Sequence, residues 1–526
     1  MFNLKQVKDN LLFSHNLAAF QRKNIKLNSN HPLILIWEFG GFPAILRKNA
    51  IHSLALNLRG YRTKIIICDG QGKACIQRSI ENKSNWSDAC SNCSLLMIKE
   101  ANRYGLEHEL ASKYISPQQV SNYERFANAI DINRIIRFRK DSVPYGSIAW
   151  NSFNRYMKGR LINLKQLDSE EKMILRSYLS STLINFHIAR AAIKREKAVA
   201  MLTSHGVYSD YAPAMYASNV ARIPGTSWIS GFTPQHFYFS SSNKLSHGDI
   251  RSPSKIEWLR LVKQPLTTTQ LSELNQFISS RYLGQKSLDV TFKNDASSLE
   301  IYQPLKQRKA YSKVVCIFAH INWDVAQDNN PMLFTTSNQW IIETLKIAIK
   351  MSDILWIVKL HPSEQSEGHE YSTEQLILDY FPQLPKHIQL IRDSDHINPL
   401  YLYKQIDIGI TLYGTVGVEL AIFGKPSINV SSVHYAGKGF THDAHNKKDY
   451  YSLLQNIANL PPLSQPQITL AKQYAYYYFI TRQMTINVLE NNTHHWGNLN
   501  IKKLDNLLPG TNKEIDQIYE SIIRGS

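Results

Sequence analysis

Two apolar stretches in the second half of the chain predict strands of a parallel sheet. Residues 354–360 are almost wholly apolar, which is typical of a strand that is buried on both faces. Residues 406–412 repeat the pattern, and a helix is expected to follow them. Both stretches end in a few polar residues. Because open α/β sheets bind ligands at the carboxyl ends of their strands, these polar residues are the first candidates for a functional site.

The first of these ends reads Lys359-Leu360-His361-Pro362. Proline cannot donate to a strand ladder and restrains the residue before it, so we expect His361 to be extended at the end of the strand. Lys359 and His361 would then present a cation and an imidazole to a phosphate group. The alternative is an ordinary loop with a solvated histidine.

The second end predicts a turn and a short helix. Gly414 allows a tight turn, and Thr415 is expected to cap the helix that follows. Gly424 is expected to end that helix in a left-handed conformation. The N-terminus of such a helix favours an anion. Glu419 lies about one turn into the helix, where its carboxylate could accept hydrogen bonds from sugar or ribose hydroxyls; the alternative is a surface glutamate that complements the helix dipole.

The first half of the chain shows the same alternation of strand and helix. Residues 33–37 predict an apolar strand that leads into Glu38 and the pair Gly40-Gly41, with a helical stretch after them. The glycines would let backbone approach a ligand closely, but they lack the G-x-G-x-x-G spacing of a dinucleotide site. Glu38 is a candidate catalytic base, and a structural carboxylate is the alternative. Residues 63–68 predict the next strand, and this βαβ pattern favours a parallel sheet.

Two more predicted strands end in histidine. Residues 198–203 are followed by His205, which is expected to meet an acceptor or a bridging phosphate unless it is a turn residue. Residues 314–318 are followed by His320 and Asp324. If the strands are parallel neighbours, both side chains face the same crevice as the two strand ends described above. The alternative for Asp324 is a cap of a helix or turn.

The size and charge of the chain narrow the function classes. With 526 residues the chain is too long for one core, so two or three domains are expected. Its 60 Lys and Arg against 42 Asp and Glu give a net charge of +18, which suits anionic partners. The absence of zinc-finger spacing and of an arginine-rich arm argues against nucleic acid. No apolar run is long enough to span a bilayer and the first residues are too polar for a secretory signal, so we expect a cytoplasmic protein with peripheral contact at the inner membrane.

The cysteines leave one question about metal open. Cys90 and Cys93 have the spacing of a metal-binding pair, and Cys68 and Cys75 lie upstream of them. A four-thiolate zinc site is therefore the alternative to buried free thiols, which are the default expectation. We predict no metal and no cofactor.

Taken together, the strand ends of the second half resemble a known family. The segments KLHP (residues 359–362), TVGVE (residues 415–419) and GKP (residues 424–426) are similar to segments of the capsule polysaccharide synthesis proteins. These are GT-B-like transferases that include the Kdo transferases of capsule export systems. The segments FAHINWD (residues 318–324) and HYAGKGFT (residues 434–441) look like further family segments in the same order, so the resemblance spans about residues 314–441. Residues 434–445 are rich in Gly, Lys and His, which predicts a mobile loop that could close on a donor. A family motif with a glutamine four residues before an aspartate is not clearly present, which weakens the expectation of a Kdo donor.

The resemblance implies an α/β, GT-B-like fold: two Rossmann-like lobes whose parallel sheets face a cleft, plus C-terminal helices. The expected divisions are an acceptor-side lobe (residues 1–245), a connection (246–310), a donor lobe for the nucleotide sugar (311–460) and C-terminal helices that brace the first lobe (461–526).

The resemblance further implies a metal-independent glycosyltransferase. It would move a sugar from a nucleotide-sugar donor, CMP-Kdo or another, to a growing capsular or surface polysaccharide or to a lipid-linked acceptor. The alternatives are a CDP-linked polyol-phosphate transferase and a non-catalytic subunit of a capsule assembly complex. The expected site residues are, for catalysis, Asp324, Glu38 and His361; for donor binding, Lys359, His361, Pro362, Gly414, Thr415, Glu419 and His320; and on the acceptor side, His205, Gly40 and Gly41.

Overall fold

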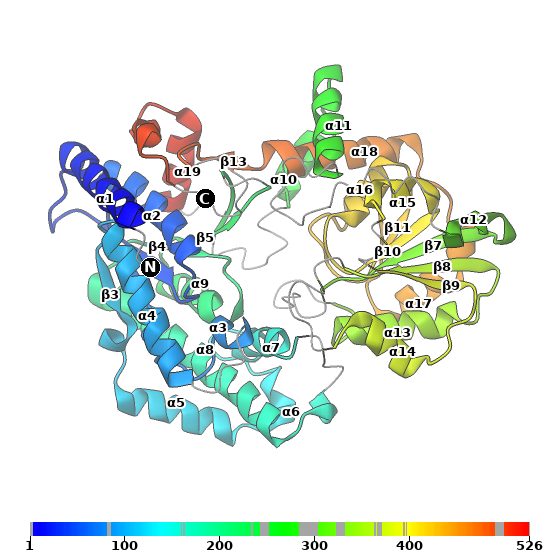
Figure 1. Ribbon diagram of the computed structural model, residues 1–526, viewed down its shortest axis with the longest axis horizontal. Coiled ribbons are helices and arrows are strands. Elements are labelled where there is room, and N and C mark those ends of the chain that lie inside the picture. The colour runs from blue at the N-terminus through cyan, green and yellow to red at the C-terminus, as the bar shows by residue number, and fades with distance from the viewer. Residues whose placement is uncertain are drawn as a thin grey trace. The chain divides into compact units, whose positions relative to one another are not determined.

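The chain divides into two compact units, which are drawn in Figure 1. Unit 1 comprises Met1–Tyr156, Asp168–Ile250 and Gln483–Ser526, and unit 2 comprises Met157–Leu167 and Arg251–Arg482. The computed structural model describes residues 4–80, 86–158, 160, 164–232, 235–241, 252–282, 303–321, 332–361, 364, 371–392, 395, 397–489 and 499–524.

Unit 1 is built on a seven-stranded sheet in the order β13-β6-β5-β4-β1-β2-β3. The five strands from β3 to β5 in this order run parallel, β6 pairs antiparallel with β5, and β13 pairs antiparallel with β6. The bounds are β1 (Leu33–Glu38), β2 (Arg62–Ile67), β3 (His108–Leu110), β4 (Ala200–Ser204), β5 (Gly225–Ser230), β6 (His236–Ser241) and β13 (Met484–Thr485).

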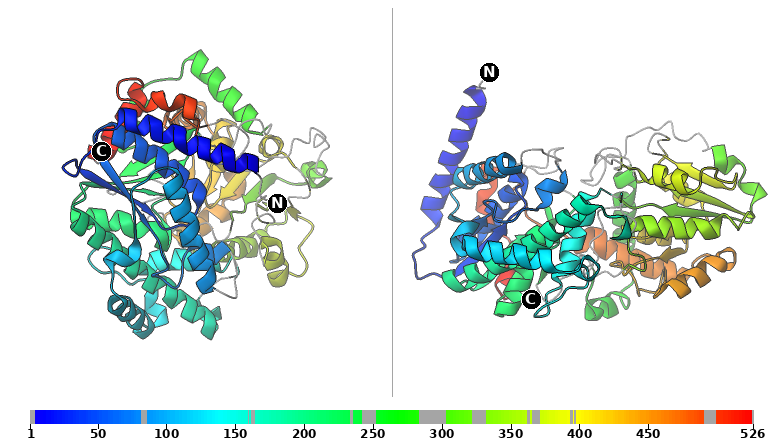
Figure 2. Two further views of the ribbon diagram at one scale, coloured as in Figure 1. Left: turned by 60° about the vertical axis from the view of Figure 1, so that its left-hand side comes forward. Right: turned by 90° about the horizontal axis from the view of Figure 1, so that it is seen from below.

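Helices cover both faces of this sheet, as the two views in Figure 2 help to follow. Ile34 and Ile36 of β1 belong to a core that includes residues of α2, α4 and α19. Trp37 points to the opposite face because side chains alternate along a strand, and its Nε1 donates to the backbone oxygen of Asp210 in α9 (2.6 Å). The helices of unit 1 are α1 (Leu4–Asn24), α2 (Pro43–Leu58), α3 (Ile76–Ile80), α4 (Trp86–Arg103), η1 (Ala111–Tyr114), α5 (Pro117–Ala129), α6 (Ile132–Ile135), α7 (Tyr145–Tyr156), α8 (Ser169–Glu196), α9 (Tyr208–Ala221), η8 (Ile501–Leu507) and α19 (Lys513–Arg524).

Unit 2 is built on a six-stranded, fully parallel sheet in the order β12-β11-β10-β7-β8-β9. Its central strands β7 and β8 are buried on both faces, which explains their continuous apolar runs. The bounds are β7 (Lys313–Phe318), β8 (Ile354–Lys359), β9 (Ile388–Ile391), β10 (Ile408–Thr411), β11 (Ser427–Asn429) and β12 (His442–Asp443).

The helices of unit 2 connect and flank these strands. Helix α18 packs against α16 and continues into the π-helix η7, after which the chain enters unit 1. The bounds are η2 (Leu164–Gln166), α10 (Lys255–Leu261), α11 (Thr268–Tyr282), α12 (Gln303–Lys306), η4 (Arg308–Ala310), α13 (Ser337–Ala348), α14 (Thr373–Tyr380), α15 (Pro399–Gln405), α16 (Val416–Ile422), α17 (Lys447–Gln455), η6 (Ile457–Asn459), α18 (Gln465–Tyr476) and η7 (Tyr477–Thr481).

The predicted α/β class, with two lobes that each contain a mainly parallel sheet, is confirmed. The two key strands of the second lobe are present as β8 and β10, and β7 lies between them. The predicted cleft and the domain boundaries at 245, 310 and 460 stay predictions. Within the described ranges, no helix combines the length and the apolar character that crossing a bilayer requires.

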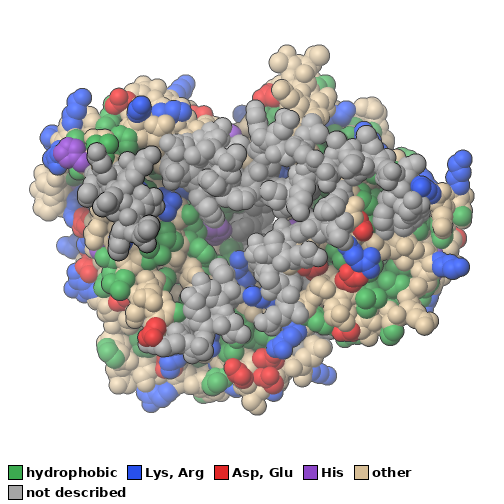
Figure 3. Space-filling model, viewed as in Figure 1, with side chains coloured by type: hydrophobic (Ala, Val, Ile, Leu, Met, Phe, Trp, Pro, Cys, Tyr) green, Lys and Arg blue, Asp and Glu red, His purple; other side chains and the backbone are tan. Residues whose placement is uncertain are grey.

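On the face drawn in Figure 3, positive charge alone does not mark a functional site among the described residues. Lys and Arg side chains are scattered among the described residues of this face, with acidic side chains between them. The site must therefore be located from the strand ends and their contacts.

Candidate active site

The carboxyl ends of three adjacent strands of unit 2 meet at one edge of the sheet. His320 follows β7, His361 follows β8 and Tyr413 follows β10. The ring centroid of His320 lies 6.0 Å from that of His361 and 5.9 Å from that of Tyr413. His320 therefore links the two strand ends that the sequence predicted to converge.

Lys359 adds a cation to this edge. It is the last residue of β8, where it pairs in register with Phe318 of β7, and its backbone oxygen accepts a hydrogen bond from Ala319 N (3.0 Å). Lys359, His361 and His320 are all partly buried. An ammonium group and two imidazoles at one strand edge can bind a phosphate ester.

The turn before α16 has the predicted backbone but not the predicted cap. Gly414 has φ +94°, and a Cβ there would meet nothing within 4 Å, so glycine is required by backbone conformation and not by crowding. Thr415 occupies the cap position without a side-chain bond to the helix backbone, because its hydroxyl donates instead to Glu419 Oε1 (2.6 Å). The predicted N-cap position of Thr415 is thus confirmed, but its side chain does not cap the helix backbone. Gly424 ends the helix with φ +74°, as predicted.

Glu419 is the centre of a buried polar cluster. It is 2% exposed, and its Oε2 accepts hydrogen bonds from Tyr403 Oη (2.8 Å) and from Tyr282 Oη. Its Oε1 accepts from Thr415 and lies 3.5 Å from Arg281 Nε. Both oxygens therefore already have protein partners. The observed role of Glu419 is to hold the turn before α16, helix α15 and the end of α11 together; its predicted contact with sugar hydroxyls stays a prediction.

The sequence did not predict which residues form hydrogen bonds with Glu419. Burial and the Glu419 carboxylate raise the pKa of Tyr282 and of Tyr403 well above the usual value, so both phenols remain hydrogen-bond donors. Arg281 Nη2 lies 3.5 Å from the Thr415 hydroxyl, which brings a guanidinium to the Gly414–Thr415 turn. No local spacing could reveal these residues, since α11 is more than a hundred residues from α16.

In unit 1, Glu38 lies at the carboxyl end of β1 and is 1% exposed. Its carboxylate accepts hydrogen bonds from Asn49 Nδ2 (2.8 Å) and from Gly40 N (3.2 Å). Burial raises the pKa of Glu38 to about 8, and the nearby Asp210 charge adds to the increase. At neutral pH this carboxyl is therefore mostly protonated, so in the resting state it is a hydrogen-bonding group more than a base.

The glycines after Glu38 make room for protein side chains. A Cβ on Gly40 would lie 1.5 Å from Tyr211 Oη, and one on Gly41 would lie 2.5 Å from Cys93 Sγ. Gly41 also has φ +68°. Gln77 Nε2 donates to the backbone oxygen of Gly40 (2.8 Å), which fixes the turn. The close approach that the sequence predicted is thus made by Tyr211 and Cys93.

His205 joins the same group of residues. It follows β4, the strand beside β1, and its ring stacks on that of Tyr211 with centroids 5.6 Å apart. His205 has φ +55° and Tyr208 has φ +63°, which are strained values for residues with a side chain. Strain of this kind gathers at functional sites, and here it follows β4, the strand that pairs with β1.

Asp210 is a further buried carboxyl that the sequence reasoning missed. It lies in the first turn of α9, and its Oδ2 accepts a hydrogen bond from Ile76 N (3.0 Å). Burial raises its pKa to about 7, although hydrogen bonds and Arg155 lower it. Two weakly acidic carboxyl groups, Glu38 and Asp210, therefore lie at the ends of neighbouring elements of unit 1.

Asp324 and Pro362 lie outside the described residues, so their predicted roles stay predictions. In the part of the chain that the structure describes, no group of three or more His, Cys, Asp or Glu side chains is arranged to hold a metal ion. None of the five cysteines forms a disulfide.

Comparison with known proteins gave similarity to solved structures only. No family model matches the chain, and no curated protein matches its sequence. A KpsC beta Kdo 2,4 transferase from Thermosulfurimonas dismutans is 15% identical, with a TM-score of 0.35, and the match covers 59% of this chain and 87% of that one. A UDP-GlcNAc 2-epimerase from Neisseria meningitidis, bound to UDP-GlcNAc, is 12% identical (TM-score 0.25, 84% and 97% covered). The glycosyltransferase SsfS6 from Streptomyces sp. SF2575 is 10% identical (TM-score 0.25, 85% and 96% covered). At these values the comparisons do not identify an activity.

Proposed function

We propose that this protein is a glycosyltransferase that takes a sugar from a nucleotide-sugar donor and binds the donor phosphate at the sheet edge of unit 2. One observation carries the proposal: His320 contacts both His361 and Tyr413, which gathers the ends of β7, β8 and β10 around one point. Carboxyl ends of parallel strands are where open α/β sheets bind their ligands.

The chemistry required of this edge is the stabilisation of a leaving phosphate. When the bond between the anomeric carbon and the phosphate oxygen breaks, negative charge develops on the phosphate. Lys359 would supply a cation, and His361, at the end of the same strand, would supply an N–H donor. Because Gly414 has no side chain, the backbone of its turn can come close to the phosphate. Glu419 acts indirectly, because it holds Thr415 and Arg281 in place next to that turn.

Unit 1 would bind the acceptor. The site would comprise Glu38, His205 and the turn at Gly40-Gly41, which Tyr211 connects through its contacts. Glu38 would act indirectly, because its buried carboxyl accepts hydrogen bonds from Asn49 Nδ2 and Gly40 N and so holds the turn beside the acceptor. Removal of the hydroxyl proton is the role predicted for Asp324. We propose a polysaccharide or lipid-linked glycan as the acceptor and CMP-Kdo as the first donor to test, on the resemblance of the sequence motifs alone.

The test is a transfer assay with a panel of nucleotide sugars, in which mass spectrometry identifies the product. Transfer of a sugar without phosphate supports the proposal, whereas transfer of a phosphoalcohol indicates the polyol-phosphate alternative. His361→Ala should lower kcat/KM about a hundredfold, close to 3 kcal/mol of barrier, because it removes a group that stabilises the leaving phosphate.

His445→Ala is the matched control, since His445 is an exposed histidine of the same unit. It should leave turnover unchanged. Equal turnover in the wild type and in a folded His361→Ala variant would contradict the proposed role of the sheet edge. No turnover with any donor would favour a non-catalytic assembly subunit.

A further inference from the structure

Unit 1 contains a second feature that the proposed site does not use: a pocket of about 590 Å³ between the start of α5 and the last turns of α8. Tyr114, Ile115 and Ala191 are among the residues that line it, and the first two are buried. Lys194 and Arg195 line it from α8. Lys113, the third basic residue of the lining, belongs to η1. The volume lies in the range of small-molecule sites.

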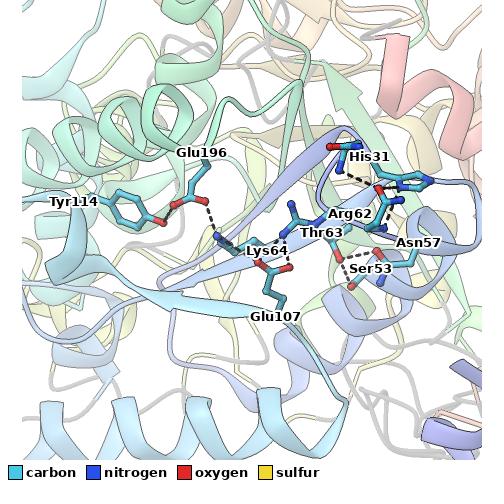
Figure 4. A network of polar contacts seen from close by, with 11 residues as sticks. His31, Ser53, Asn57, Arg62, Thr63, Lys64, Glu107, Tyr114 and Glu196 are labelled. Carbon is cyan, nitrogen blue, oxygen red and sulfur yellow. Dashed lines mark hydrogen bonds and ion pairs between the residues drawn. The ribbon is translucent and has the colours of Figure 1, made fainter. Parts of the chain in front are cut away.

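No acidic residue lines this pocket, and the carboxylates nearest in sequence are already paired. Glu196 accepts hydrogen bonds from Lys64 Nζ (2.5 Å) and from Tyr114 Oη (2.8 Å), as Figure 4 shows. Burial opposes ionisation of Glu196, but these hydrogen bonds outweigh it and lower its pKa, so the carboxylate stays charged and bound to Lys64. Glu109 forms an ion pair with Lys113.

The two remaining cations are therefore uncompensated. Within the ranges that the structure describes, neither Lys194 nor Arg195 forms an ion pair with a carboxylate. Both are exposed residues in the last turn of α8, where they also complement the helix dipole. Complementing the helix dipole requires no ligand, whereas a binding site predicts that an anion binds to Lys194 and Arg195.

Arg195 is held in one orientation. Its Nη1 donates to the backbone oxygen of Lys113 (2.9 Å), and its guanidinium carbon lies 5.8 Å from the centroid of the Tyr114 ring. A guanidinium that is already oriented loses less freedom when it binds a carboxylate or phosphate. A solvated arginine whose only task is to complement a helix dipole does not need such a fixed position.

We infer that this pocket binds a compact anion: a molecule of about the size of a sugar phosphate or a sugar acid, whose phosphate or carboxylate group meets Lys194 and Arg195. The buried Tyr114 and Ile115 would contact the less polar face of the ligand. The inference does not depend on the proposed transferase activity. The same chemistry is offered by a free anion and by the headgroup of an anionic lipid, and the experiment separates these sources.

The experiment uses the full chain and a double variant, Lys194→Glu with Arg195→Glu. Binding of glucose 6-phosphate and of glucuronate is measured by isothermal titration calorimetry. Sedimentation with vesicles that contain phosphatidylglycerol, compared with vesicles of phosphatidylcholine alone, tests the lipid source. The control is Lys503→Glu, which changes the charge of an exposed lysine on η8, away from the pocket.

We expect saturable binding of the soluble anions or of the anionic vesicles to the wild type and to Lys503→Glu. The double variant should bind at least about tenfold more weakly. The probe that binds shows whether the ligand is a free anion or the headgroup of an anionic lipid. Equal binding by the double variant and the wild type, or no saturable binding of any probe to the wild type, overturns the inference. If the double variant does not fold, Lys194→Ala is used instead, with a smaller but measurable loss of affinity expected.

Discussion

Replacing Glu419 by alanine should loosen helix α11 from the rest of unit 2. The Glu419 carboxylate is the acceptor for three hydroxyl groups and the counterion of Arg281, whose side chain is 9% exposed. Removing one partner of a buried ion pair costs about 3–5 kcal/mol, because the other charge is left in a poorly solvated place. The hydroxyls that lose their acceptor are part of the same loss, so we expect about 3–5 kcal/mol in total and not a sum of separate contributions.

Hydrogen exchange measured by mass spectrometry is the suitable assay. Hydrogen exchange reports local opening of each element separately, which suits a chain of two units. A cost of about 3 kcal/mol corresponds to at least about a hundredfold faster exchange of the amides in α11. Helices of unit 1 should exchange as in the wild type.

Glu374→Ala is the matched control in the same unit. Glu374 of α14 pairs with Arg392, but their side chains are 26% and 47% exposed. Such surface pairs contribute about 0–1 kcal/mol, so exchange in α14 should change little. If Glu419→Ala accelerates exchange in α11 no more than Glu374→Ala accelerates it in α14, the cluster does not hold α11 and the reasoning is refuted.

Three further changes test other parts of the account. Because the pKa of Glu38 is raised to about 8 in the folded state, from a usual value of 4.5, the folded protein binds this proton more tightly. Stability should therefore fall as pH rises from about 4.5 to 8, by up to about 1.4 kcal/mol per pH unit; thermal melts of Glu38→Gln should show a weaker decrease, and identical pH slopes would contradict this. Gly414→Ala should cost about 1–2 kcal/mol from backbone strain alone, since its Cβ meets open space. Gly417→Ala should cost more in the same melts, because its Cβ would lie 2.5 Å from Tyr435 Oη, and an equal cost for both variants would argue against this packing.

The sequence predicted those features that depend on neighbours along the chain. The apolar runs of β8 and β10, the left-handed Gly424 and the turn at Gly414 all follow from local rules, and the structure has them. The sequence also predicted that His320 lies near His361, on the condition that their two strands run parallel as neighbours, and β7 and β8 do so.

Features that depend on distant contacts could not be predicted. Thr415 has the residue type of a helix cap, but a buried carboxylate competes for its hydroxyl, and that carboxylate is buried only because α11 covers it. In the same way, the sequence predicted that the turn at Gly40 approaches a ligand closely, whereas Tyr211 of α9 occupies the space next to Gly40. Local pattern thus located the strand ends but not the residues that pack against them.

The segment 434–445 shows the same limit. Its Gly, Lys and His content predicted a mobile loop that could close on a donor. Tyr435 and Phe440 are instead fully buried, and His434 stacks on Tyr478 with ring centroids 4.3 Å apart. Asp443 also accepts hydrogen bonds from within the segment, so the segment is anchored to unit 2 and the prediction of a mobile loop is wrong.

A crystal structure of the protein with a bound nucleotide tests the central claim most directly. The ligand is whichever of CMP, CDP, UDP and GDP most raises the melting temperature; a ligand at 100 times its dissociation constant should add about 2.7 kcal/mol of stability. We predict that a phosphate oxygen lies about 3 Å from a side-chain nitrogen of Lys359 or His361, or from a backbone N–H of the turn at Gly414. A nucleotide phosphate bound away from the ends of β7, β8 and β10 would contradict it.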